Sequence, residues 1–121
     1  MSGHRRARVA QEMREQIALL IARELKDPRI GFVTVTRVEV SADLGYAKAF
    51  VSVLGDAKQK ADSLSGLQQA TGFVRRLLGR RLRMRVLPQL QFVYDKGIDA
   101  TDRVARLLEE VRAGDDEGSE D

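Results

Sequence analysis

The fold is decided by residues 32–54, FVTVTRVEVSADLGYAKAFVSVL, in which two β-rich runs flank one polar turn. Val and Thr dominate the first run, 32–40, and both residue types favour strands. The second run, 46–54, alternates two sets of residues: Ala47, Ala49, Val51 and Val53 against Tyr46, Lys48 and Ser52. Alternation with a period of two is typical of a strand with one buried face. Because residues 41–45 (SADLG) have turn chemistry, we expect an antiparallel hairpin.

Helical spacing flanks this hairpin on both sides. Upstream, apolar residues recur every three or four positions within 6–25, and Pro28 ends the helix because it disfavours helical geometry at the residue before it. Downstream, the same spacing predicts two helical runs, 64–70 and 73–78, separated at Gly72. Alternation then predicts a third strand over 85–94, and helical spacing a last helix over 101–112.

The order of these elements, α-β-β-α-α-β-α, constrains the sheet. A two-helix crossover is long enough to connect parallel strands, so the second and third strands should be parallel neighbours. Pro88 has no N–H to donate to a neighbouring strand, which places the third strand at an edge. We therefore expect an α+β fold with a three-stranded mixed sheet, the second strand in the middle, and helices on one face.

Length and composition indicate one domain in a chain of 121 residues. We expect the domain to span 1–113, with a flexible N-terminus (1–5) and a disordered acidic tail (114–121). The absence of cysteine excludes disulfides and thiol catalysis, and the single histidine, His4, has no partner for a metal site, so no metal or cofactor is expected. No apolar run is long enough to cross a membrane, which favours a cytoplasmic protein. We expect it to act as a monomer.

The charge is distributed unevenly. The chain carries 21 basic and 18 acidic residues, a net charge of +3. Five of the acids lie in 114–121, which holds no base, so the remaining 113 residues carry 21 − 13 = +8. A basic body favours polyanionic partners, although charge alone is equally consistent with a need for solubility.

Six arginines fall within eleven residues: Arg75, Arg76, Arg80, Arg81, Arg83 and Arg85. On a helix, four of them (Arg75, Arg76, Arg80 and Arg83) share one arc, opposite an apolar half formed by Phe73, Val74, Leu77, Leu78 and Leu82. Arginine presents a planar fork that suits phosphate oxygens and can also stack on bases. An ordinary solvated helix face is the alternative. The absence of Asp and Glu from 68–92 favours a nucleic-acid contact for all six arginines.

Two further features support this interpretation. The N-terminal arginines Arg5, Arg6 and Arg8 form a basic arm that could follow a polyanion, although the helix after them also carries glutamates. Ala70, Thr71 and Gly72 lie between the two helical runs, where small residues permit a sharp junction and Gly72 can adopt backbone angles closed to other residues. The amides that begin the second helix would then attract anions beside the arginines. Close packing is the alternative reason for small residues here.

Evidence for catalysis is poor. The sequence has no phosphate-binding loop with its lysine, no nucleophile elbow and no triad containing histidine. Asp99 and Asp102 resemble paired carboxylates, but they stand where a helix start favours acids, so capping is the better interpretation. We expect a binding protein with no small-molecule substrate, and keep a generic RNA- or DNA-binding module, a nuclease and a protein-only adaptor as alternatives.

The sequence resembles the ribosome-binding factor A family over residues 8–94. The stretches that carry the resemblance are RVAQEM (8–13), ELKDPRIG (24–31), DLGYAK (43–48), ATGFVR (70–75) and RVLPQLQF (85–92). The resemblance implies a type II KH-like domain in which an interhelical Ala-x-Gly kink, here Ala70-Thr71-Gly72, replaces the Gly-x-x-Gly loop of other KH domains. It also implies binding to free small (30S) ribosomal subunits and 16S rRNA, support of late 16S rRNA processing and 30S maturation, and cold adaptation in some bacteria.

Overall fold

The computed structural model describes residues 2–97. Its elements follow the order α-β-β-α-α-β: α1 (Ser2–Glu24), β1 (Val33–Val40), β2 (Tyr46–Val53), α2 (Ala57–Gln69), α3 (Thr71–Arg81) and β3 (Gln89–Tyr94). The predicted last helix, 101–112, and the acidic tail, 114–121, lie outside the described residues. For the residues described, the expected element types and their order are confirmed.

The three strands form one mixed sheet in the order β1-β2-β3. The hairpin strands β1 and β2 are antiparallel, and β2 and β3 are parallel, with Tyr46 opposite Gln89. This confirms the central place of β2 and the edge position of β3. A bulge between Val35 and Arg37 shifts the register of β1, so that Val35 and Val38 both face the core although they are three residues apart.

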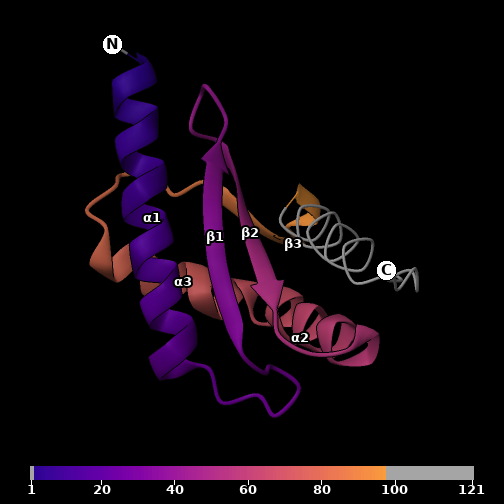
Figure 1. The fold of residues 1–121 in the computed structure, drawn as a ribbon. Helices are drawn as coiled ribbons and strands as arrows, with labels where there is room; N and C mark the ends of the chain where they lie inside the picture. The colour runs from indigo at the N-terminus through magenta and orange to yellow at the C-terminus, as the bar shows by residue number, and fades with distance from the viewer. Residues whose placement is uncertain (1, 98–121) are drawn as a thin grey trace, which may run out of the picture.

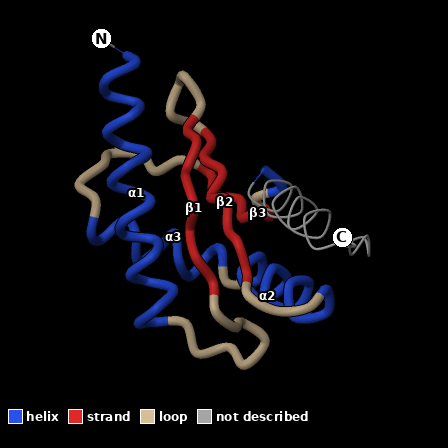
Figure 2. The backbone as a smooth tube through the Cα atoms, viewed as in Figure 1, coloured by secondary structure: helices blue, strands red, loops and turns tan. Residues whose placement is uncertain are grey.

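All three helices cover one face of this sheet (Figure 1). The first helix, α1, runs alongside β1, whereas α2 and α3 cross behind the strands, so that no helix within residues 2–97 covers the other sheet face (Figures 1 and 2). The core between the layers consists of apolar side chains from all six elements, among them Met13, Ile17, Val51, Leu67, Val74, Leu78 and Phe92. Burial of this shared core fixes the helices against the strands.

The hairpin turn is held by Ser41 and Asp43. The Ser41 hydroxyl donates to Asp43 Oδ1 over 2.7 Å, and the Gly45 amide donates to the same oxygen over 2.9 Å. These two donors, the hydroxyl first, hold the pKa of Asp43 below its usual value. The turn residue with a positive φ is Leu44, at 59°, whose side chain packs against the core.

The start of α2 is fixed by Gly55, Asp56 and Gln59. The Asp56 carboxylate accepts the Gln59 amide over 2.8 Å, and the Gln59 side chain accepts the Asp56 amide over 2.7 Å, which makes a reciprocal capping box. Gly55 has a φ of 140°, and a β-carbon there would lie 2.4 Å from Gln59 Oε1. A side chain at position 55 would therefore break the cap.

Several boundaries differ from those predicted, and three differ by four residues or more. The second helix, α2, begins at Ala57 rather than at residue 64. The first helix begins at Ser2 rather than at residue 6, so residues 2–5, part of the segment expected to be flexible, are helical. The third strand begins at Gln89 rather than at residue 85, and residues 82–88 form a connection outside the sheet. Pro88, which has no backbone N–H, ends that connection.

Candidate nucleic-acid interface

The junction between α2 and α3 is made by a single residue, Ala70, with φ −86° and ψ 1°. Its amide donates to the carbonyls of Gly66 and Leu67, and the Thr71 hydroxyl donates to the Leu67 carbonyl over 3.1 Å. The predicted interhelical junction at Ala70, Thr71 and Gly72 is therefore present. Its turn arises at Ala70 with backbone angles open to any residue.

Neither reason predicted for a glycine at position 72, special backbone angles or close packing, holds in the structure. Gly72 lies within α3, has no positive φ, and a β-carbon built on it would meet nothing within 4 Å. It is neither a strained turn residue nor a close-packing residue. What its small size does provide is an exposed stretch of backbone at the start of α3, where no side chain caps the helix.

The apolar side of α3 is narrower than predicted. Val74 and Leu78 are buried in the core, and Leu82 is buried directly after the helix. Phe73, expected on this side, is 38% exposed, and the guanidinium of Arg76 lies 5.8 Å from the centre of its ring. The start of α3 therefore presents an aromatic side chain beside an arginine at the surface.

Five of the six clustered arginines are exposed, and we call them the basic surface: Arg76, Arg80, Arg81, Arg83 and Arg85. The first three belong to α3, which ends at Arg81. Arg83, which helical spacing places on the same arc, lies with Arg85 in the connection to β3. The basic surface is thus built from the second half of one helix and the segment that follows it.

The acids of the described residues leave the basic surface free of ion pairs. No Asp or Glu occurs in 68–92. The ion pairs found within residues 2–97 join Arg29 to Asp27, Arg37 to Glu39 and Asp95, and Lys58 to Asp62. Arg81 has an uncharged partner, since its Nη1 donates to Gln16 Oε1 over 3.3 Å. These five guanidinium groups are therefore available to phosphates.

Arg75, the sixth arginine, is half-buried and points to the protein's own backbone. Its Nε donates to the Pro88 carbonyl over 2.9 Å, and its Nη2 donates to the Leu87 carbonyl over 2.8 Å. Sequence reasoning missed this arrangement, because helical spacing places Arg75 beside Arg76 and contains no information about carbonyls twelve and thirteen residues away.

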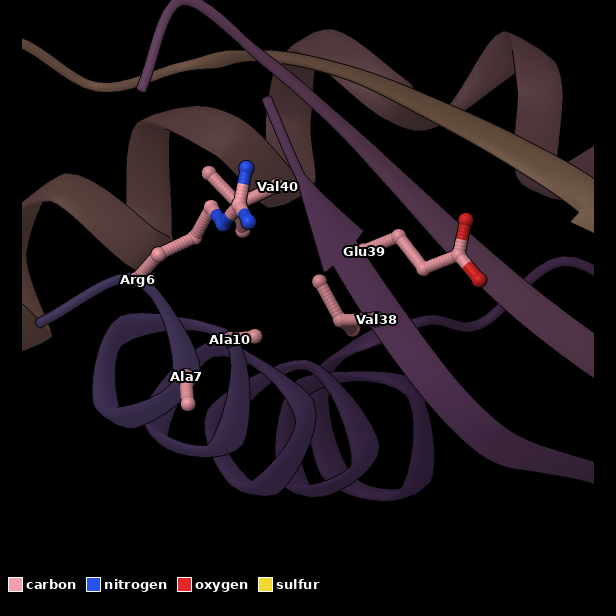
Figure 3. Close-up of a pocket in the computed structure, with 6 residues that line it drawn as sticks. All are labelled: Arg6, Ala7, Ala10, Val38, Glu39 and Val40. Carbon is pink, nitrogen blue, oxygen red and sulfur yellow. The ribbon is translucent and has the colours of Figure 1, made fainter. Parts of the chain in front are cut away.

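The N-terminal arginines Arg5, Arg6 and Arg8, predicted to form a basic arm, are exposed on α1. The end of α3 meets this helix through the contact between Arg81 and Gln16. Arg6 lines an open groove of about 410 Å³ with Ala7, Ala10, Val38, Glu39 and Val40. Figure 3 shows Arg6 reaching over the groove toward Val40, while Glu39 projects from the other side of β1. Its walls are mainly apolar, with one cation at the rim.

The strongest chemical feature of residues 2–97 is a concentration of guanidinium groups, which suits the binding of anions. Within residues 2–97, no group of three or more His, Cys, Asp or Glu side chains could hold a metal ion. In the same part of the chain, no helix is both long and apolar enough to cross a membrane. The concentrated chemistry of the described residues is a set of guanidinium groups on a helix and its C-terminal extension, which suits an extended polyanion.

Known proteins match this sequence over most of its length. A family model described as "Ribosome-binding factor A" matches residues 5–108. The ribosome-binding factor A of Desulfitobacterium hafniense is 52% identical over 112 residues, covering 93% of this chain and 90% of the relative. That of Heliobacterium modesticaldum is 48% identical over 116 residues, covering 96% of each chain.

Solved structures agree with the sequence matches. The crystal structure of ribosome-binding factor A from Thermus thermophilus superposes with a TM-score of 0.67 at 29% identity, covering 74% of this chain and 93% of that one. A model of the Thermus thermophilus protein fitted into a cryo-electron microscopy map of its complex with the 30S subunit gives a TM-score of 0.64 at 28% identity, covering 75% and 96%. With the fold and the sequence in agreement, the chain belongs to the ribosome-binding factor A family.

Proposed function

We propose that this protein binds free small (30S) ribosomal subunits through 16S rRNA and assists late subunit maturation and 16S rRNA processing. It does so by binding and not by catalysis, as a single copy acting in the cytoplasm. Family membership supports a ribosome-binding role. The relative from Thermus thermophilus, which has been fitted into a map of a 30S complex, supports the small subunit as the partner.

The observation that carries the proposal is the basic surface. Three of its five exposed arginines lie on α3, whose other side is anchored in the core by Val74 and Leu78, and the other two lie in the connection that follows this helix. Each arginine that neutralises a phosphate releases counterions, so the affinity should fall steeply as salt is added. Arg5, Arg6 and Arg8 on α1 provide a second cationic group that would extend the same contact.

A binding protein can assist maturation only through differential affinity. If the arginines fit the phosphate arrangement of one rRNA conformation better than that of another, binding shifts the folding equilibrium toward the better fit. A surface held by the core discriminates between such arrangements more sharply than a mobile one, because it cannot adapt to both. The protein would therefore leave the chemistry of rRNA processing to other factors.

The test is a double charge reversal, Arg76→Glu with Arg80→Glu, measured by cosedimentation with purified small subunits across a salt series. We expect at least a tenfold loss of affinity and a salt slope flattened by roughly 1.4 to 1.8, since each lost phosphate contact removes about 0.7 to 0.9. The matched control is Arg23→Glu with Lys26→Glu, which lowers the net charge by the same amount at exposed positions near the C-terminal end of α1. Binding that is equal for both double variants would remove the basic surface from the interface.

The alternatives predict different results with the unmodified protein. A generic RNA- or DNA-binding module would bind unrelated nucleic acid as tightly as it binds free small subunits. A nuclease would cleave precursor 16S rRNA in a metal-dependent manner, and a protein-only adaptor would have negligible RNA affinity even at low salt. We expect enrichment on free small subunits over whole ribosomes and no cleavage.

A further inference from the structure

Arg75 and Gly79 form one contact site for the segment that leaves α3. The two residues are four positions apart and so lie above one another on the same face of the helix. The Arg75 guanidinium donates to the Leu87 carbonyl over 2.8 Å and to the Pro88 carbonyl over 2.9 Å. At Gly79, a β-carbon would lie 3.0 Å from Leu87 Cδ1, so the absence of a side chain admits Leu87 against the helix.

These contacts fix the far end of the connection between α3 and β3. At its near end, Leu82 is buried and its amide donates to the Leu78 carbonyl over 2.9 Å. Directly after Pro88, the Gln89 amide donates to the Gly45 carbonyl over 2.9 Å and begins β3. The carbonyls of Leu87 and Pro88 precede the strand and receive the guanidinium instead. Residues 83–86 are thus a short span held at both ends.

This span carries Arg83 and Arg85, the two members of the basic surface that no helix supports. Free to move, their backbone would have to be ordered each time RNA is bound, and that cost would reduce the affinity. Held by Arg75, it is ordered before RNA arrives. The half-buried Arg75 fork faces the protein's own carbonyls, whereas its neighbour Arg76 is exposed.

We propose that Arg75 is a positioning residue, which holds the 82–88 connection against α3 so that Arg83 and Arg85 extend the RNA-binding surface of the helix. The inference rests on the proposed function of the basic surface, and it gives Arg75 a different role from that of the five exposed arginines. Arg75 acts on RNA through Arg83 and Arg85, and not by contacting phosphate itself.

Two conservative substitutions separate positioning from phosphate contact. Lysine at position 75 keeps the charge but cannot donate to both carbonyls as a fork, and methionine loses the charge as well. Positioning predicts that Arg75→Lys and Arg75→Met weaken small-subunit binding alike, by roughly three- to tenfold. Direct contact predicts that Arg75→Lys stays close to the unmodified protein. The matched control is Arg76→Lys at the exposed neighbouring position, which should change binding less than Arg75→Lys.

A double-mutant cycle adds a measurement that a purely structural role would not affect. We expect Arg83→Gln with Arg85→Gln to weaken binding, and Arg75→Lys to add almost nothing once those two arginines are gone. Amide exchange within 82–88 should also accelerate in Arg75→Lys, while α1 and the sheet exchange as before. Leu87→Ala removes the same contact from the other side and should repeat the pattern, which keeps the test available if Arg75 variants fold poorly.

The outcomes are distinguishable. Additive losses from Arg75→Lys and the Arg83/Arg85 pair would overturn the positioning role while leaving the basic surface intact. An Arg83/Arg85 pair whose removal does not weaken binding would overturn the contribution of the connection. The role of the basic surface itself would be overturned if Arg76→Glu with Arg80→Glu also bound normally.

Discussion

At the scale of single residues, Gly55 and Gly72 differ in whether their backbone conformation requires glycine. Gly55 precedes α2, and Gly72 lies in the first turn of α3. Gly72 has helical backbone angles and open space around its α-carbon. Gly55 has a φ of 140° and stands against the capping side chain of Gln59. The sequence pattern singles out Gly72, because this residue separates two runs with helical spacing. The position whose backbone angles favour glycine is instead Gly55.

We therefore predict opposite effects of the same substitution on the free energy of unfolding. Gly72→Ala should leave it unchanged or raise it by up to about 1 kcal/mol, because alanine favours the helical state. Gly55→Ala should lower the free energy of unfolding by about 1–3 kcal/mol. Alanine is strained at a φ of 140°, and its β-carbon would displace the Asp56–Gln59 cap. Urea denaturation followed by circular dichroism measures both. A marked loss in Gly72→Ala, or none in Gly55→Ala, would contradict this assignment.

At the scale of the elements, Asp95 joins the end of β3 to β1 across the central strand. Its side chain is only 2% exposed, accepts the Thr36 hydroxyl over 2.6 Å, and pairs with Arg37 Nη1 over 3.2 Å. Its amide donates to the Val51 carbonyl of β2 over 2.8 Å. The bulge in β1 lies at Thr36, between the paired residues Val35 and Arg37, so this irregularity of the sheet coincides with the contact.

We predict that Asp95→Ala lowers the free energy of unfolding by about 1.5–3 kcal/mol, because the partly buried Thr36 hydroxyl and the Arg37 guanidinium lose the acceptor that they share. Thr36→Val removes one hydroxyl and keeps a side chain of similar shape, so it should lower the free energy of unfolding by less, about 1 kcal/mol. Thermal unfolding of both variants beside the unmodified protein provides the measurement. A cost below about 0.5 kcal/mol for Asp95→Ala, typical of surface positions, would show that the contact does not stabilise the sheet.

Element types could be predicted from the sequence where one physical signal dominates. The period-two alternation of β2 and the helical spacing of α1 each reflect a single buried face. The edge position predicted for β3 is confirmed, although Pro88, the residue on which that prediction rested, precedes the strand. Boundaries could not be predicted where tertiary contacts decide them. Residues 85–88 were predicted as part of the third strand, yet the Arg75 side chain takes the carbonyls of Leu87 and Pro88. The side of a helix on which an arginine lies can be predicted from the sequence, but its hydrogen-bond acceptors twelve and thirteen residues away cannot.

At the scale of the whole molecule, the electric field depends on the distribution of charge as well as on its sum. All of the surplus positive charge lies before residue 114: residues 1–113 carry 21 − 13 = +8, and the five acids of 114–121 lower the sum to +3. Exposed arginines on α1, on α3 and on the connection after α3 contribute to this surplus. Such a field raises the rate at which a polyanion is encountered, and the effect falls as salt screens it.

We predict that the five acids of 114–121 slow the association with small subunits. Replacing them together by their amides (Asp115→Asn, Asp116→Asn, Glu117→Gln, Glu120→Gln and Asp121→Asn) raises the net charge to +8 without changing the length of the chain. Stopped-flow association at low salt should be several-fold faster, because encounter with RNA is steered by the summed charge. Near 1 M salt, where the Debye length is about 3 Å, the two proteins should associate at the same rate. An equal rate at low salt would mean that these carboxylates do not oppose the basic body, and a slower rate in the amide variant would mean that they contact a cationic part of the subunit.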